Sequence, residues 1–183
     1  ISPEERRGRV AKAQELMRQA GVGALLLEPG SSMLYFTGIS WWRSERLTAV
    51  VIPGDGEIAV VTPYFEEPSV RESMAFGDDV RTWNENEHPL LLINGILADR
   101  GAFGKPLAME ETVRYFVISE LQLVNPGIEI VSGSAITRGC RMIKSPHGLQ
   151  LMRRASDIII AALRDSYPKI TAGMKPEDVA QLI

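Results

Sequence analysis

Cysteine and histidine are both scarce in this sequence of 183 residues, which contains one cysteine and two histidines. The single thiol, Cys140, excludes an intramolecular disulfide, and no cysteine spacing typical of a zinc site is present. The cysteine content therefore does not indicate whether the protein works in a reducing or an oxidising compartment. Each histidine adjoins a proline at an expected helix start (His88-Pro89 and Pro146-His147), so we predict capping or surface positions for both and no metal ligand in this chain.

Long hydrophobic runs are also absent. The longest unbroken apolar run, residues 158–163, is far shorter than the roughly 20 residues that a transmembrane helix needs, so we expect no membrane association. No signal peptide is visible, yet the chain begins at Ile1 and not at methionine. A cytoplasmic location is the default expectation, and export with a removed leader stays the alternative.

A large excess of charge of one sign is lacking as well. The 20 basic and 23 acidic side chains give a formal net charge of −3, which provides no general attraction to nucleic acid. A local basic cluster is interpreted as a solvated face, and we expect no nucleic-acid partner; its members are Arg138, Arg141, Lys144, Arg153 and Arg154. A hydrophobic content of 45% with 23% charged residues is typical of a folded globular protein.

The common catalytic and phosphate-binding motifs are missing too. Gly21-Val22-Gly23 hints at a dinucleotide loop, but it lacks the third glycine and precedes its strand instead of following it. There is no Walker phosphate loop, no His-Glu-x-x-His pair and no Gly-x-Ser-x-Gly elbow. Paired carboxylates are interpreted as helix starts and solvated edges, and serines beside glycines as turn and capping residues; these are Glu66, Glu67, Glu85, Glu87, Glu110, Glu111, Ser31, Ser32, Ser132 and Ser134. We therefore predict no catalytic residue in this chain.

What the sequence does contain is a regular alternation of helix and strand patterns. Ser2-Pro3 with Glu5 predicts a helix start, and Gly21 its end. Two β-rich runs, 47–52 and 58–62, flank a Pro-Gly-Asp-Gly turn, which predicts a hairpin and hence a mixed sheet. The remaining pattern predicts strands at 24–27, 80–83, 106–109 and 128–131 and helices at 66–74, 89–99 and 113–123. This alternation indicates a layered α/β domain that ends near residue 139.

A strongly marked helix starts late in the chain, after Ser145-Pro146. It is expected to run to about Pro168, and its apolar side chains share one face: Leu149, Met152, Ile159, Ile160 and Leu163. Pro176 begins another helix just before the chain stops. Because a domain seldom ends on an amphipathic helix without a partner, we predict one domain at 1–139 and, at 140–183, a junction and the start of a second.

The most unusual surface candidate is the segment 37–47, which holds two adjacent tryptophans. Successive side chains of a strand point to opposite sides, so Trp41 and Trp42 cannot both face one core. We expect one of them to be exposed beside Arg43 and Arg46, and aromatic side chains with arginine are typical of interface hot spots and ligand clamps. The alternative is a loop that folds onto its own domain, with one tryptophan covering the core.

Three segments, in this order, resemble the creatinase/prolidase/Xaa-Pro aminopeptidase family. They are RVAKAQELMRQAGVGALLL at 9–27, SSMLYFTGIS at 31–40, and the junction RMIKSPHGLQLMRRASDII at 141–159. The resemblance covers essentially the whole chain. One departure is Gly148, where the family usually has Glu, so the capping box that this Glu would complete with Ser145 is lost.

The resemblance implies a three-layer α/β/α domain with a mixed sheet, followed by the first helix or helices of a truncated catalytic domain of the pita-bread type. In the family that second domain holds two Asp, one His and two Glu around two divalent ions, Mn, Co or Zn. None of these ligands can be placed here, so no cofactor is expected within this chain. In relatives the loop after the Tyr-x-Thr-Gly segment reaches a neighbouring subunit's active site. This implies a homodimer or higher homo-oligomer, and contact of Trp41, Trp42, Arg43 and Arg46 with substrate or partner.

The function implied by the resemblance is that of a metallopeptidase that hydrolyses Xaa-Pro bonds in peptides, with this chain inactive alone. Two alternatives stay open. One is a creatinase-type amidinohydrolase in the same fold, and the other is a non-catalytic pseudo-peptidase that serves as a protein-interaction module.

Overall fold

The computed structural model describes residues 1–182, and the chain divides into two compact units, Ile1–Met142 and Ile143–Ile183. The division falls inside the segment interpreted as a domain junction; that a second domain begins here stays a prediction. The first unit holds strands β1 (Ala24–Leu27), β2 (Ala49–Pro53), β3 (Ala59–Pro63), β4 (Asp79–Trp83), β5 (Leu107–Met109) and β6 (Ile130–Ser132). Its α-helices are α1 (Pro3–Ala20), α2 (Ser31–Thr37), α3 (Glu67–Ser73), α4 (Pro89–Asp99), α5 (Tyr115–Val124) and α6 (Ser134–Arg141), and a 3-10 turn, η1 (Tyr64–Glu66), follows β3.

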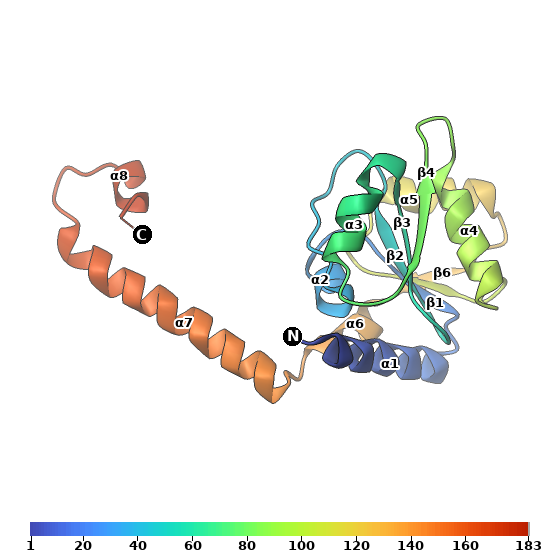
Figure 1. The fold of residues 1–183 in the computed structure, drawn as a ribbon, viewed down its shortest axis with the longest axis horizontal. Coiled ribbons are helices and arrows are strands. Elements are labelled where there is room, and N and C mark those ends of the chain that lie inside the picture. The colour runs from blue at the N-terminus through green and yellow to red at the C-terminus, as the bar shows by residue number, and fades with distance from the viewer. Residues whose placement is uncertain (183) are drawn as a thin grey trace. The chain divides into compact units, whose positions relative to one another are not determined.

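The six strands form one sheet in the order β4-β3-β2-β1-β5-β6 (Figure 1). Strand β2 runs antiparallel to its neighbours β1 and β3, whereas the pairs β1–β5, β3–β4 and β5–β6 are parallel. The hairpin and the mixed sheet predicted from the sequence are confirmed. Because β2 alone is reversed, the carboxyl ends of the other five strands lie at one edge of the sheet.

Helices cover both faces of the sheet, and each face has its own apolar core. One core joins α4 and α5 to alternate strand residues, for example Leu26 and Val51. The other joins α1, α2, α3 and α6 to the residues between them, for example Leu25 and Ile52. The alternation follows from the two-residue period of a strand. The three-layer α/β/α fold is therefore confirmed.

Helix α1 shows how local signals set the boundaries of an element. The Ser2 hydroxyl accepts a hydrogen bond from Glu5 N at 3.2 Å, which satisfies one of the free amides of the first turn. Gly21 ends the helix in the left-handed conformation, with φ of 69°. The buried residues Val10, Ala13 and Met17 then face α6 and the sheet, and α1 and α6 lie side by side in Figure 1.

The two short helices α2 and α6 were not expected from the sequence. Ser31, Ser32 and Ser134 were interpreted as turn or capping residues, but they form the first turns of these helices. Both helices follow a glycine, Gly30 or Gly133, without a side-chain cap. Helices this short are marginal by themselves and are stabilised by tertiary packing, so their local sequence carries little helical signal.

The second unit consists of α7 (Pro146–Ser166), the 3-10 turn η2 (Tyr167–Lys169) and α8 (Pro176–Ala180). As predicted, Ser145 is the N-cap of α7, and its hydroxyl accepts a hydrogen bond from Gly148 N at 3.0 Å. Large apolar side chains remain exposed along the helix: Leu149, Leu151, Met152, Ile158, Ile159, Ile160 and Leu163. All five side chains of the apolar face expected from the sequence are therefore exposed.

Gly148→Glu is expected to stabilise α7. A Cβ at residue 148 would lie 3.2 Å from the Ser145 hydroxyl oxygen, and the capping-box motif accommodates this pair of residues. The substitution removes the glycine penalty of about 1 kcal/mol and adds a carboxylate that can return to the N-cap amide. Helical circular dichroism and the melting temperature should both rise. Gly148→Ala is the control for helix propensity without the carboxylate, and a lower melting temperature for Gly148→Glu would contradict the capping assignment.

Candidate functional site

The carboxyl edge of the sheet is the candidate functional site. In open α/β sheets, ligands bind beyond the carboxyl ends of the strands. The segment 38–47, here called the tryptophan loop, connects α2 to β2 and enters β2 at this same edge. The edge therefore brings the residues singled out from the sequence next to the ends of β1 and β3.

The tryptophan loop is anchored at both ends and exposes one side chain in its middle. Ile39 and Leu47 are buried. Trp41 is half-buried and packs against the core shared by α1 and α2, whereas Trp42 is 89% exposed. The loop thus combines both alternatives considered for it: Trp41 covers the core, and Trp42 faces away from it.

The two arginines of the loop differ in how their guanidinium groups are engaged. Arg46 Nε donates to Glu85 Oε1 at 2.5 Å, and the guanidinium also lies 5.4 Å from the centre of the Phe65 ring. The hydrogen bond that Arg46 donates to the Glu85 carboxylate raises the pKa of Arg46. Among the described residues, the Arg43 side chain makes one hydrogen bond, from its Nε to the Pro29 carbonyl oxygen at 3.1 Å. Of the two, Arg43 is therefore better suited to meet an added carboxylate.

A buried ion pair beneath the loop was not found by sequence reasoning. Glu28, the residue after β1, is fully buried and accepts hydrogen bonds from Arg114, which precedes α5. The Arg114 guanidinium also donates to the Ser44 carbonyl oxygen in the tryptophan loop. The two partners are 86 residues apart in the chain, so no local pattern signals the pair.

The Tyr-x-Thr-Gly segment forms the end of α2 and the turn into the loop. Thr37 Oγ1 donates to the Met33 carbonyl oxygen at 2.7 Å and accepts from Ile39 N at 3.1 Å. Gly38 has φ of 91°, and a Cβ there would lie 3.0 Å from the Ala75 Cβ. Both the threonine hydroxyl and the absence of a side chain on the glycine are thus required by the turn.

The three segments that carry the family resemblance meet at α2. Arg9 of α1 donates to the Tyr35 carbonyl oxygen at 2.8 Å, and its guanidinium lies 4.1 Å from the centre of the Tyr35 ring. Tyr35 Oη donates to the Cys140 carbonyl oxygen at 2.9 Å, and burial raises the pKa of Tyr35. Arg141 Nη1 donates to Ser32 Oγ at 2.8 Å. The first two segments and Arg141, the first residue of the third, are therefore joined by hydrogen bonds within the first unit.

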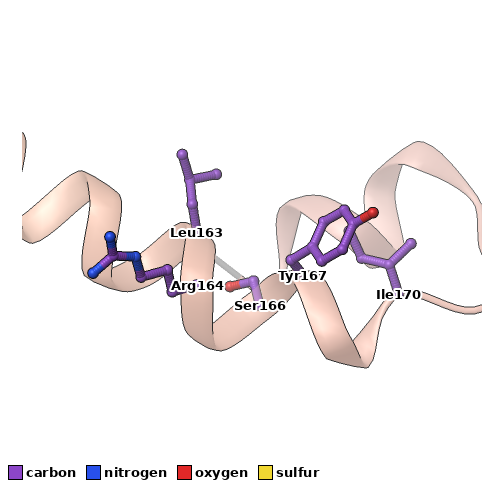
Figure 2. A pocket seen from close by; sticks show the side chains of 5 residues that line it. All are labelled: Leu163, Arg164, Ser166, Tyr167 and Ile170. Carbon is purple, nitrogen blue, oxygen red and sulfur yellow. The ribbon is translucent and has the colours of Figure 1, made fainter.

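The cavity found in the second unit has a volume of about 460 Å³ and a mostly apolar lining (Figure 2). Arg164 is its one charged lining residue, and Figure 2 shows that it extends away from Tyr167 and Ile170. The hydroxyl of Ser166 is within hydrogen-bonding distance of two backbone carbonyl oxygens, those of Ala162 and Leu182. This hollow fits apolar side chains and contains no arrangement for acid–base chemistry.

Within residues 1–182, no group of three or more His, Cys, Asp and Glu side chains is arranged to hold a metal ion. His88 is the N-cap of α4, and His147 lies in the first turn of α7. In the same part of the chain, no helix is both long enough and apolar enough to span a membrane.

The fold and this edge define a three-layer α/β/α domain with an aromatic loop whose two ends are buried. A family model described as "Creatinase/Prolidase N-terminal domain" matches residues 9–143. The chain belongs to this family, as the three segments at 9–27, 31–40 and 141–159 predicted.

Known relatives agree with this assignment. The chain is 32% identical over 197 residues to an uncharacterised peptidase of Schizosaccharomyces pombe, covering 100% of this chain and 42% of the relative. It is 30% identical to the probable dipeptidase PepE of Mycobacterium bovis, over 82% of this chain and 40% of the relative. Its structure is similar to that of dipeptidase PepE from Mycobacterium ulcerans, with a TM-score of 0.86 and 25% identity over 100% of this chain and 49% of that one. The chain thus spans less than half the length of these relatives.

Gly38→Ala is expected to destabilise the first unit more than Gly21→Ala does. Both glycines have positive φ, which costs an L-residue about 1–2 kcal/mol. Only residue 38 adds a close contact, with Ala75, because a Cβ at residue 21 meets nothing within 4 Å. Urea denaturation followed by fluorescence measures the two losses, and equal losses would show that the contact with Ala75 does not constrain the turn.

Proposed function

We propose that this chain is the N-terminal, non-metal-binding domain of a hydrolase that cleaves Xaa-Pro bonds in short peptides. The observation that carries the proposal is the family match over 9–143 in a chain that spans 42% of a peptidase relative. The names of the relatives support a dipeptidase. The remainder of such a protein would then hold the reaction centre, and residues 1–183 alone would be inactive.

The family resemblance implies two divalent metal ions, Mn, Co or Zn, in the reaction centre. The described residues do not fit them, because no cluster of ligand-type side chains exists among residues 1–182. We therefore assign no chemical step to this chain. Its contribution would lie in substrate contact and in assembly.

We propose that residues 140–183 are the junction and the beginning of the catalytic domain. Exposed apolar side chains on one face of α7 include Leu149, Met152 and Ile159, and a second series on another side includes Leu151 and Ile158. A helix that is apolar over so much of its circumference is normally buried among other elements. Further chain of the same protein is the occupant that fits this helix.

We also propose that the tryptophan loop contacts the substrate or the partner subunit in a homodimer or higher oligomer. Trp42, 89% exposed on an anchored loop, has the properties of an interface hot spot. The Arg43 Nη atoms would pair with a substrate carboxylate, because a planar guanidinium can donate two parallel hydrogen bonds to the two carboxylate oxygens. Arg46 would contribute less directly to substrate or partner contact, because its guanidinium is already paired with Glu85.

The first test expresses the complete reading frame that contains this chain and assays Xaa-Pro dipeptides and tripeptides with added manganese. Hydrolysis by the complete protein, and none by residues 1–183, is the expected result. Creatine is the competing substrate in a parallel assay. Turnover of creatine in place of peptides would establish the amidinohydrolase alternative, and no turnover of either would favour the interaction module.

The second test compares kinetic constants of loop variants in the complete protein. Arg43→Ala and Trp42→Ala should raise KM for short peptides roughly tenfold, as expected for the loss of one charge-assisted contact or one hot-spot side chain. Arg18→Ala is the control. Arg18 lies in the last turn of α1, which leads into the amino end of β1, whereas the tryptophan loop lies at the carboxyl edge of the sheet. Unchanged KM for both loop variants would contradict the role of the loop.

A further inference from the structure

Glu28 is an acidic side chain in a place where acids are seldom found. It is 0% exposed and directly follows the fully buried strand β1. A buried carboxylate is strongly destabilising unless it is paired and hydrogen-bonded. Its partner is therefore a structural requirement at the carboxyl edge of the sheet.

Arg114 supplies this pairing with three of its N–H groups. Its backbone N donates to Glu28 Oε2 at 2.7 Å, while Nε and Nη2 donate to Glu28 Oε1 at 2.8 and 2.6 Å. The guanidinium also lies 4.6 Å from the centre of the Phe116 ring. Both carboxylate oxygens are thus bonded, and the guanidinium also contacts an aromatic ring.

The remaining nitrogen, Nη1, reaches the tryptophan loop and donates to the Ser44 carbonyl oxygen. A second tie comes from the loop itself, since Arg43 Nε donates to the Pro29 carbonyl oxygen at 3.1 Å. Pro29 is the neighbour of Glu28 in the chain. One tie therefore joins the loop to Glu28 through Arg114, and the other joins it directly to Pro29.

The ends of the loop are held independently of these ties. Ile39 N donates to Thr37 Oγ1 at 3.1 Å, and the Leu47 carbonyl oxygen accepts from Trp83 Nε1 at 3.1 Å. Trp42 lies in the middle of the loop, directly before the residues that carry the two ties. This segment without regular secondary structure is thus tied both at its ends and in its middle.

We propose that the Glu28–Arg114 pair is a positioning device that presents Trp42 and Arg43 in a fixed orientation to the substrate. The anchoring of the loop follows from the contacts of this chain alone, whereas its effect on substrate rests on the proposed function. Arg114 touches no substrate in this account and acts through the Ser44 backbone.

The anchoring is tested first on residues 1–183 by amide hydrogen exchange of Arg114→Lys. Lysine keeps a positive charge for Glu28 but lacks the planar fork that reaches Glu28 and Ser44 together. Loop amides should exchange about tenfold faster, a loss of protection of the size expected for one hydrogen bond, while β2 and β3 keep their protection. Unchanged loop exchange would overturn the anchoring.

Arg100→Lys is the matched control. Arg100 likewise bridges a carboxylate and a backbone carbonyl oxygen, with Nη2 2.7 Å from Asp79 Oδ2 and Nε 3.0 Å from the Glu57 oxygen. It does so away from the loop, so loop exchange should stay at the wild-type rate. If Arg114→Lys unfolds the chain, the anchoring is tested instead by the NMR backbone order parameters of the loop in the wild-type protein. Values near 0.85 support anchoring, and values below about 0.6 overturn it.

The substrate role is tested by the kinetics of Arg114→Lys in the complete protein. KM for Xaa-Pro dipeptides should rise about threefold or more, with kcat less affected, because a loosened loop weakens substrate binding. A general loss of stability would instead lower the active fraction and leave KM unchanged. Faster loop exchange with unchanged KM would overturn the substrate role alone, and a complete protein that cleaves no Xaa-Pro peptide would overturn the proposed function.

Discussion

The burial of β1 is the constraint on which the rest of the first unit depends. This strand lies between β2 and β5, and its four residues are buried on both faces of the sheet. Whatever follows it is therefore held in place: Glu28, Pro29 and the first turn of α2. The tryptophan loop is tied directly to Pro29 by Arg43 and indirectly to Glu28 through Arg114, so both ties lead back to the residues that follow this buried strand.

Much of the fold could be predicted because its main elements carry local signals. The Ser2 cap and Gly21 stop bound α1, and the turn between β2 and β3 identified the antiparallel pair that makes the sheet mixed. Helices α2 and α6 were missed, since each is short, follows a glycine and is held by contacts with distant residues. The hydrogen bond from Tyr35 to the Cys140 carbonyl oxygen spans 105 residues and has no local signature.

The candidate site could be predicted only in part, for the same reason. Two adjacent tryptophans cannot share one core, and the structure separates a half-buried Trp41 from an exposed Trp42. Sequence alone did not reveal that Arg46 is engaged by Glu85, 39 residues away, or that Arg114 supports the loop. Contact of Trp41, Trp42, Arg43 and Arg46 with substrate or partner stays a prediction. One available signal was an acid directly after an apolar strand, which requires a buried partner.

The central claim is that this family domain presents Trp42 to the substrate of the complete protein. The most direct measurement is a crystal structure of that protein with an uncleaved Xaa-Pro dipeptide analogue bound. The account predicts that the Trp42 ring, from the same or a neighbouring subunit, lies within about 4 Å of the analogue, the distance of side-chain contact. A bound analogue with Trp42 still surrounded by solvent in every subunit would contradict it.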